Sequence, residues 1–237
     1  MREKYAHRLR CPACDRPLEF VAFACEGVEI TSGWFRCSDD EHGYPLILGV
    51  PRLLPPELLP ALQRREHLDA YCRSHPRELP PAWRERRERQ RATTDQQRVV
   101  EMVNQYAFQW RRYVTPYDQN DARELQRLLG STVDLKAWEG KSVIDVGGGQ
   151  GRYVFPLLAA GAREVVCLDM GEAILLAHEH TRHDDRVLCV QGDLYHPPFT
   201  AEFDLAWPIG GMQHLPDPAR GCASRAGLAR PEGEILV

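Results

Sequence analysis

Short apolar runs recur along the second half of the chain, and each ends close to a polar or charged residue. Four of them have the length of buried strands, namely residues 142–146, 165–170, 187–194 and 203–209. Residues 153–160, after the first run, have the pattern of a helix that follows a strand. Strands that alternate with helices predict an α/β fold with a doubly wound, mostly parallel sheet.

Two helices are predicted before the first of these strands. One covers the stretch from residue 95, because its apolar positions follow a helical spacing that places one face against a core. These positions are Val99, Val100, Met102, Val103, Tyr106, Ala107 and Trp110. The other helix spans residues 121–129, and Gly130 is suited to end it.

The region ahead of these helices is rich in proline and in charge. Arginine and glutamate alternate through residues 83–91, which is typical of a solvated helix face. The prolines that punctuate the region are Pro55, Pro56, Pro60, Pro76, Pro80 and Pro81. We therefore divide the chain into a small domain over residues 1–54, a linker over 55–98 and a larger domain over 99–237.

Composition and charge disfavour several classes of protein. With 237 residues, the chain is long enough for one substantial domain and a small one. The net charge of −4 gives no global basic field, so it disfavours nucleic acid as a partner. No apolar run reaches the roughly 18–20 residues that cross a bilayer, and the charged N-terminus lacks the apolar segment of a signal peptide. We therefore expect no membrane partner and a reducing, cytoplasmic compartment for the eight cysteines.

The turn after the first predicted strand carries the most informative motif of the chain. It has the form Asp-x-Gly-x-Gly-x-Gly, made by Asp145, Gly147, Gly149 and Gly151. Such a turn presents bare backbone N–H groups and lets a ligand approach the main chain closely. A dinucleotide fingerprint needs a glycine where Arg152 stands, and a carboxylate before the glycines suits a ligand with a cationic amino group. The motif therefore points away from a nicotinamide dinucleotide.

Two further acids end the next strands at equal spacing. Asp169 lies 24 residues after Asp145, and Asp193 lies another 24 residues on. An acid about 20 residues past a glycine turn is placed to accept hydrogen bonds from both hydroxyls of a ribose. With these motifs, roughly residues 105–237 resemble the class I S-adenosylmethionine (SAM)-dependent methyltransferases of the type 11 group. The resemblance includes a Leu-Pro-Asp-Pro segment after the fourth strand and a proline turn before a fifth strand.

The resemblance implies a Rossmann-like fold and a SAM cofactor held by the turn and the strand ends. In the family, the three acids address the methionine amino group, the ribose and the adenine amine, and a helix with an aromatic-x-x-Gln-Trp stretch covers the pocket. The residues expected to bind the cofactor are Asp145, Gly147, Gly149, Gly151, Asp169, Met170, Asp193, Leu194, Tyr106 and Trp110. For Tyr106 and Trp110, simple packing is the alternative.

One histidine is a candidate for acid–base catalysis. His214 follows the fourth strand, at the sheet edge where substrates of open α/β folds bind. The ordinary pKa of histidine, about 6.5, suits proton removal near neutral pH. The family often has two adjacent histidines here, whereas this chain has Gln213 before His214, which alternatively only lines the substrate pocket. By contrast, His178, His180 and His183 lack the spacing of a zinc-binding helix, so we interpret them as solvated.

The first 54 residues carry a candidate metal site. A Cys-x-x-Cys pair precedes a strand-like stretch, a third cysteine and a histidine, which are residue types that bind zinc. A segment this short has little core, so a bound metal is a physically expected source of stability. The segment resembles a small zinc-ribbon domain, although Asp40 stands where a fourth cysteine belongs. The expected ligands are Cys11, Cys14, Cys37 and His42, with Cys25 as a spare candidate. The alternative is a degenerate ribbon whose thiols are small buried side chains.

We interpret the chain as a methyltransferase that moves a methyl group from SAM to a small-molecule acceptor. Two alternatives remain open, a non-catalytic module that binds SAM or zinc and an RNA-base methyltransferase. The sequence stops within the predicted fifth strand, so we expect the last two strands of a complete methyltransferase sheet to be missing. The fifth strand is then an exposed edge, through which two copies could form a homodimer.

Overall fold

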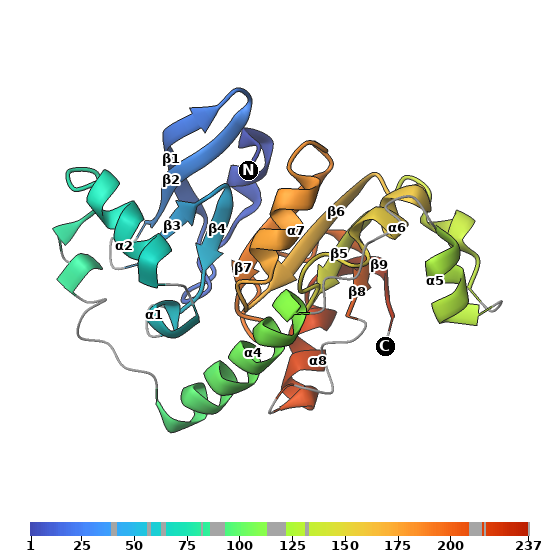
Figure 1. Cartoon of the computed structure of the whole chain (residues 1–237). Coiled ribbons are helices and arrows are strands. Elements are labelled where there is room, and N and C mark those ends of the chain that lie inside the picture. Colours follow the sequence, from blue (N-terminus) through green and yellow to red (C-terminus); the bar gives the residue numbers. More distant parts are fainter. Residues whose placement is uncertain are drawn as a thin grey trace.

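One mixed β-sheet runs through the part of the chain that the structure describes (Figure 1). This computed structural model describes residues 1–38, 42–55, 58–62, 65–81, 83–85, 93–112, 122–130, 133–208, 215 and 217–236. Among these residues the sheet has nine strands, in the order β1-β2-β3-β4-β7-β6-β5-β8-β9. The sheet joins an antiparallel N-terminal part to a parallel C-terminal part.

The antiparallel part is formed by the first four strands, which follow a short 3-10 helix (η1, Glu3–Arg8). Their bounds are β1 (Leu18–Glu26), β2 (Glu29–Cys37), β3 (Gly43–Ile47) and β4 (Val50–Leu53). Each strand pairs with the next, and β4 then lies parallel to β7, with Arg52 level with Gln191. The N-terminal strands therefore extend the larger sheet along its edge.

The parallel part confirms the predicted strands and the α/β fold class. Its strands are β5 (Ser142–Val146), β6 (Glu164–Asp169), β7 (Val187–Gly192), β8 (Phe203–Trp207) and β9 (Ala229–Ile235). All of their pairings are parallel. β7 and β8 each end two residues earlier than the apolar pattern indicated. Pairing of β9 with a second copy stays a prediction.

Helices lie on both faces of this sheet (Figure 1). They are α1 (Leu59–Leu62), α2 (Arg65–Ser74), α4 (Thr94–Arg112), α5 (Ala122–Leu129), η3 (Leu135–Trp138), α6 (Val154–Ala159), α7 (Ile174–Thr181) and α8 (Pro218–Ala226). In α4, Val103 is buried and Val99 packs against the same core, as the helical spacing predicted. Gly130 follows α5 with a φ of 69°, a conformation that suits glycine at a helix end. Among the described residues, none of the helices combines the length and the apolar character needed to span a membrane.

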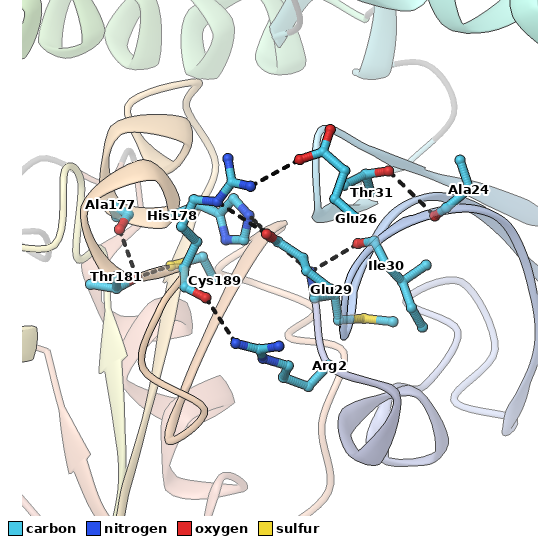
Figure 2. Close-up of polar contacts among 12 residues, drawn as sticks. Arg2, Ala24, Glu26, Glu29, Ile30, Thr31, Ala177, His178, Thr181 and Cys189 are labelled. Atoms are coloured by element: carbon cyan, nitrogen blue, oxygen red, sulfur yellow. Dashed lines mark hydrogen bonds and ion pairs between the residues drawn. The ribbon is translucent and has the colours of Figure 1, made fainter.

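A buried carboxylate fastens the β1–β2 hairpin to α7 (Figure 2). Glu29 Oε1 lies 2.6 Å from His178 Nε2, and Glu29 Oε2 lies 3.1 Å from Arg182 Nε. The amino group of Met1 is 3.4 Å from Glu29 Oε1. Burial favours a raised pKa for Glu29, but the cationic groups of Met1, His178 and Arg182 outweigh it and hold the pKa below its ordinary value of 4.5. The interpretation of His178 as solvated is therefore wrong, because the N-terminal hairpin covers it.

Candidate functional site

The glycine turn after β5 folds back on the end of β6. Gly147, Gly149 and Gly151 all have positive φ, at 80°, 55° and 83°, which only glycine adopts without strain. The N–H groups of Gly147 and Gly148 donate to Leu168 O, at 2.8 and 3.2 Å. The expectation that the turn presents bare N–H groups is thus wrong for these residues, because β6 takes up the donors. Close approach of a ligand to the main chain of the turn stays a prediction.

Asp145 lies beneath this turn, at the end of β5. Its side chain has no exposed surface, and neither carboxylate oxygen has a hydrogen-bond partner among the described residues. Burial, reinforced by the nearby charge of Asp169, raises the pKa of Asp145 well above its ordinary value. A Cβ atom on Gly148 would lie 2.7 Å from Asp145 Oδ2, so the turn packs directly on the carboxylate. Contact between Asp145 and a ligand amino group stays a prediction, and it requires the turn to shift.

Asp169 ends β6 beside the same turn. Gly149 N donates to Asp169 Oδ2 at 2.9 Å, and Gly171 N donates to Oδ1 at 2.7 Å. Burial raises the pKa of Asp169, and these two N–H groups partly offset that effect. Each oxygen keeps a further lone pair, so the oriented carboxylate can still accept from two hydroxyl groups.

Asp193 follows β7 and is part of a hydrogen-bonded chain that sequence reasoning missed. Tyr195 N donates to Asp193 Oδ1 at 2.9 Å, and His196 Nδ1 lies 2.7 Å from Oδ2. His196 Nε2 lies 2.9 Å from Arg220 Nη2 on α8. Because arginine can only donate, Nε2 is the acceptor, and the neutral ring therefore carries its proton on Nδ1 and donates it to Asp193. His196 stands three residues after a predicted site acid, which is a signal that could have indicated it.

A cavity of about 520 Å³ is lined by Asp193, whereas Asp145 and Asp169 are not among its lining residues. Met170 and Asp193 line it on the sheet side, Val99 of α4 faces them, and Pro55 and Leu58 come from the segment after β4. The other lining residues are Gln96, Arg98, Tyr195, His196, Asp217 and Arg220. The N-terminal part of the chain therefore forms one wall of a cavity at the carboxyl edge of the parallel sheet, where ligands of such sheets bind.

The structure describes some of the remaining predicted site residues and not others. Met170 and Leu194 are buried beside Asp169 and Asp193, at 2% and 7% exposure. Tyr106 is half-buried on α4, and Trp110 belongs to the same helix but its side chain lies outside the described residues. His214, the candidate base, also lies outside the described residues.

The four predicted metal ligands come together at the start of the chain. The ligand atoms of Cys11, Cys14, Cys37 and His42 all lie within 4.8 Å of one another, and Cys14 Sγ is 3.4 Å from Cys37 Sγ. Zn–S bonds of about 2.3 Å place two thiolates about 3.8 Å apart on a tetrahedral ion, so the cluster suits zinc. Tyr44, whose hydroxyl oxygen is 3.2 Å from Cys11 Sγ, is buried, and burial raises its pKa. The spare candidate, Cys25, is exposed on β1 and outside this cluster.

Comparison with known proteins finds similarity in the C-terminal part. Residues 144–237 match the family model described as "Methyltransferase domain". The tRNA U34 carboxymethyltransferase of Methylococcus capsulatus is 29% identical over 153 residues, which cover 59% of this chain and 46% of the relative. The ubiquinone biosynthesis O-methyltransferase of Aromatoleum aromaticum is 27% identical over 142 residues, which cover 58% and 59%. The chain thus spans about half the length of these curated relatives.

Solved structures include similar folds at low identity. One is the Burkholderia thailandensis 1,6-didemethyltoxoflavin-N1-methyltransferase, solved with its substrate and S-adenosylhomocysteine. It shares 24% identity with a TM-score of 0.46, and the match covers 61% of this chain and 63% of the other. The parallel strand order β7-β6-β5-β8-β9, with acids at the ends of β5, β6 and β7, agrees with the Rossmann-like fold that the resemblance implied. The match of residues 144–237 to the methyltransferase-domain model agrees with the resemblance seen in the sequence.

Proposed function

We propose that the chain transfers a methyl group from SAM to a small-molecule acceptor. The observation that carries the proposal is the arrangement of Asp145, Asp169 and Asp193 at the ends of neighbouring strands β5, β6 and β7, with the glycine turn packed on Asp145 and hydrogen-bonded to Asp169. Two backbone N–H groups fix the carboxylate of Asp169. The family match over residues 144–237 supports the same cofactor.

The residues of the turn and the strand ends fit SAM. Asp169 would accept hydrogen bonds from the ribose hydroxyls, and Met170 and Asp193 would border the adenine in the cavity. The carboxylate of Asp145 has no partner among the described residues, and it would accept from a cationic amino group once the turn above it shifts. Bound SAM supplies a methyl group already activated by its sulfonium, so the chain mainly orients the acceptor and excludes water.

His214 is proposed as the residue that takes the proton from the acceptor. A histidine of ordinary pKa can act as a general base near neutral pH. If it does, His214→Ala lowers kcat by about 100-fold with a small change in the KM for SAM. The variant also loses the acidic limb of the pH–rate profile. A variant with unchanged kcat and pH profile assigns His214 to packing or pocket lining.

An RNA base is the second candidate acceptor. Four of the matched curated proteins are named tRNA U34 carboxymethyltransferases. The cavity lining includes Arg98, Arg220 and the aromatic ring of Tyr195, residue types that contact phosphates and stack on splayed bases. From its net charge, we expected the chain not to bind nucleic acid. These findings do not support that expectation.

A transfer assay separates these acceptors. The purified chain is incubated with methyl-labelled SAM and either a panel of quinols and small phenols or total tRNA, beside the variant Asp169→Ala. Label in a small-molecule product that the variant fails to form supports the main proposal. Label in tRNA moves the assignment to the second candidate. If the chain binds S-adenosylhomocysteine but labels neither pool, the non-catalytic alternative is favoured.

We also propose that Cys11, Cys14, Cys37 and His42 hold one zinc ion with a structural role. A zinc ion joins parts of a small fold that has little core of its own. The Tyr44 hydroxyl is suited to donate to the Cys11 thiolate and steady it. Metal analysis of the purified chain is expected to give about one zinc per molecule, lost in Cys37→Ser and retained in Cys25→Ser. A metal content near zero in the folded chain contradicts the proposal.

A further inference from the structure

A row of three polar residues crosses the sheet where the N-terminal part meets the larger sheet. Arg52 of β4 is level with Gln191 of β7, and Gln191 is level with Asp169 of β6. Residues paired in this way lie side by side on the same face of a sheet. Arg52 and Gln191 have no exposed surface at all. The row therefore leads from the N-terminal strands to the proposed ribose acid, and a hydrogen bond joins its first two members.

The side-chain amide of Gln191 has only one possible orientation in this row. Arg52 Nη1 donates to Gln191 Oε1 at 2.6 Å, and a guanidinium can only donate, so the amide oxygen must face it. Gln191 Nε2 then faces the other way and donates to Met170 O at 2.8 Å and to Leu62 O at 2.9 Å. Arg52 thereby fixes the amide that holds the residue next to Asp169.

Arg52 is retained at this position at an energetic cost. Its Nε and Nη2 atoms have no acceptor among the described residues, and a buried donor without a partner is destabilising. Burial lowers the pKa of Arg52 to about 10, although the nearby carboxylate of Glu172 opposes this shift. An apolar side chain could fill this site without the cost of buried donors that lack acceptors. The presence of an arginine therefore suggests a role for its guanidinium.

The segment between β6 and α7, which contains Met170, also lies close to helix α2. His67 of α2 places Nδ1 3.4 Å from Glu172 Oε1. We define residues 169–173, between β6 and α7, as the ribose loop. Elements that precede residue 75 therefore hold this loop through Gln191 at Met170, and His67 lies close to it at Glu172.

We propose that Arg52 is a positioning residue for the ribose loop, acting through Gln191 and Met170 to set the place of the Asp169 carboxylate. The proposal rests on the proposed function, because it assumes that Asp169 binds a ribose. Without Arg52, Gln191 Oε1 loses its buried donor, and the side chain can move into the space that the guanidinium leaves. The loop then loses its tie to β7, and Asp169 shifts relative to the glycine turn.

Binding of S-adenosylhomocysteine and of its 2′-deoxyribose analogue tests this role. In the wild type, the analogue is expected to bind at least tenfold more weakly, because Asp169 loses a hydroxyl partner. Arg52→Met is expected to weaken S-adenosylhomocysteine about tenfold and to bring the ratio between the two ligands close to one. Arg36→Met is the matched control, since Arg36 lies on the exposed part of β2, paired with Glu19, and its variant should keep both values.

Gln191→Glu tests the link between Arg52 and Met170. Its carboxylate keeps an acceptor for Arg52 but leaves Met170 O and Leu62 O without their donor, so the thermal midpoint should fall. The variant loses the donor to Met170 O, so S-adenosylhomocysteine should also bind at least tenfold more weakly. Arg52→Lys retains a donor and should recover part of the affinity, and it carries the test if Arg52→Met does not fold.

The same measurements distinguish failure of the positioning role of Arg52 from failure of the proposed function. A folded wild type that binds neither ligand contradicts the proposed function itself. A wild type that binds with the expected ratio, together with folded variants at Arg52 and Gln191 that keep the same affinity and ratio, overturns the positioning role alone.

Discussion

The Glu29 cluster gives the most quantitative prediction about how the N-terminal strands are fastened to the larger domain. Glu29→Gln keeps the shape of the side chain and removes its charge. In the wild type, Glu29 is 6% exposed and lies 2.6 Å from His178, whose side chain is 13% exposed. Removing one partner of a buried pair costs about 3–5 kcal/mol. Because the amide can still accept one hydrogen bond, we expect Glu29→Gln to lower the free energy of unfolding by about 3 kcal/mol.

The pH dependence of this difference has a definite sign. The folded-state pKa of Glu29 lies below its ordinary value of 4.5, so its charge contributes stability above that pH. The contribution is lost as the pH falls below 4.5 and passes through the folded-state pKa, where Glu29 becomes protonated. The stability difference between wild type and Glu29→Gln should therefore be full at pH 7 and shrink steadily below pH 4.5.

Urea unfolding, followed by circular dichroism at several pH values, measures this difference. Glu26→Gln is the matched control, because Glu26 contacts the same Arg182 from an exposed position on β1. We expect that control to stay within about 0.5 kcal/mol of the wild type. A Glu29→Gln variant as stable as the wild type at pH 7, or a difference that is unchanged at pH 3.5, would refute the reasoning.

Three further predictions address local geometry. Gly49→Ala should lower stability by about 2 kcal/mol more than Gly130→Ala, because both glycines have positive φ but only the first would press a Cβ against His178. Urea midpoints of the two variants measure this. Gly148→Ala should weaken S-adenosylhomocysteine at least tenfold by calorimetry, since its Cβ would lie 2.5 Å from Cys167 Sγ and displace the turn. Chelation of zinc should lower the thermal midpoint of the wild type but not of Cys37→Ser, as scanning calorimetry would show.

The sequence predicted those parts of the fold that depend on local patterns. β5 was predicted from an apolar run that ends at a glycine turn, and α4 from apolar positions at helical spacing. Cys11 and Cys14 marked one half of the metal cluster because two thiols at this spacing suit one ion. In each case, residues close together in the sequence are sufficient to predict the element or the ligand pair.

Long-range packing explains what the sequence could not predict. Nothing local to Arg52 indicates that it pairs with Gln191, because the two are brought together only when β4 adds to the edge of β7. The sequence pattern around His178 indicates a solvent-exposed side chain. The distant hairpin that carries Glu29 covers this side chain in the folded protein. The donors of the glycine turn were likewise assigned to a ligand, although the end of β6 accepts them.

The central claim, that the strand ends of β5, β6 and β7 bind SAM, is tested most directly by calorimetry with S-adenosylhomocysteine. The account predicts micromolar binding to the wild type, about −8 kcal/mol, and its loss in a folded Asp169→Ala variant. A folded wild type that does not bind the ligand, or an Asp169→Ala variant that binds it equally well, would contradict the account.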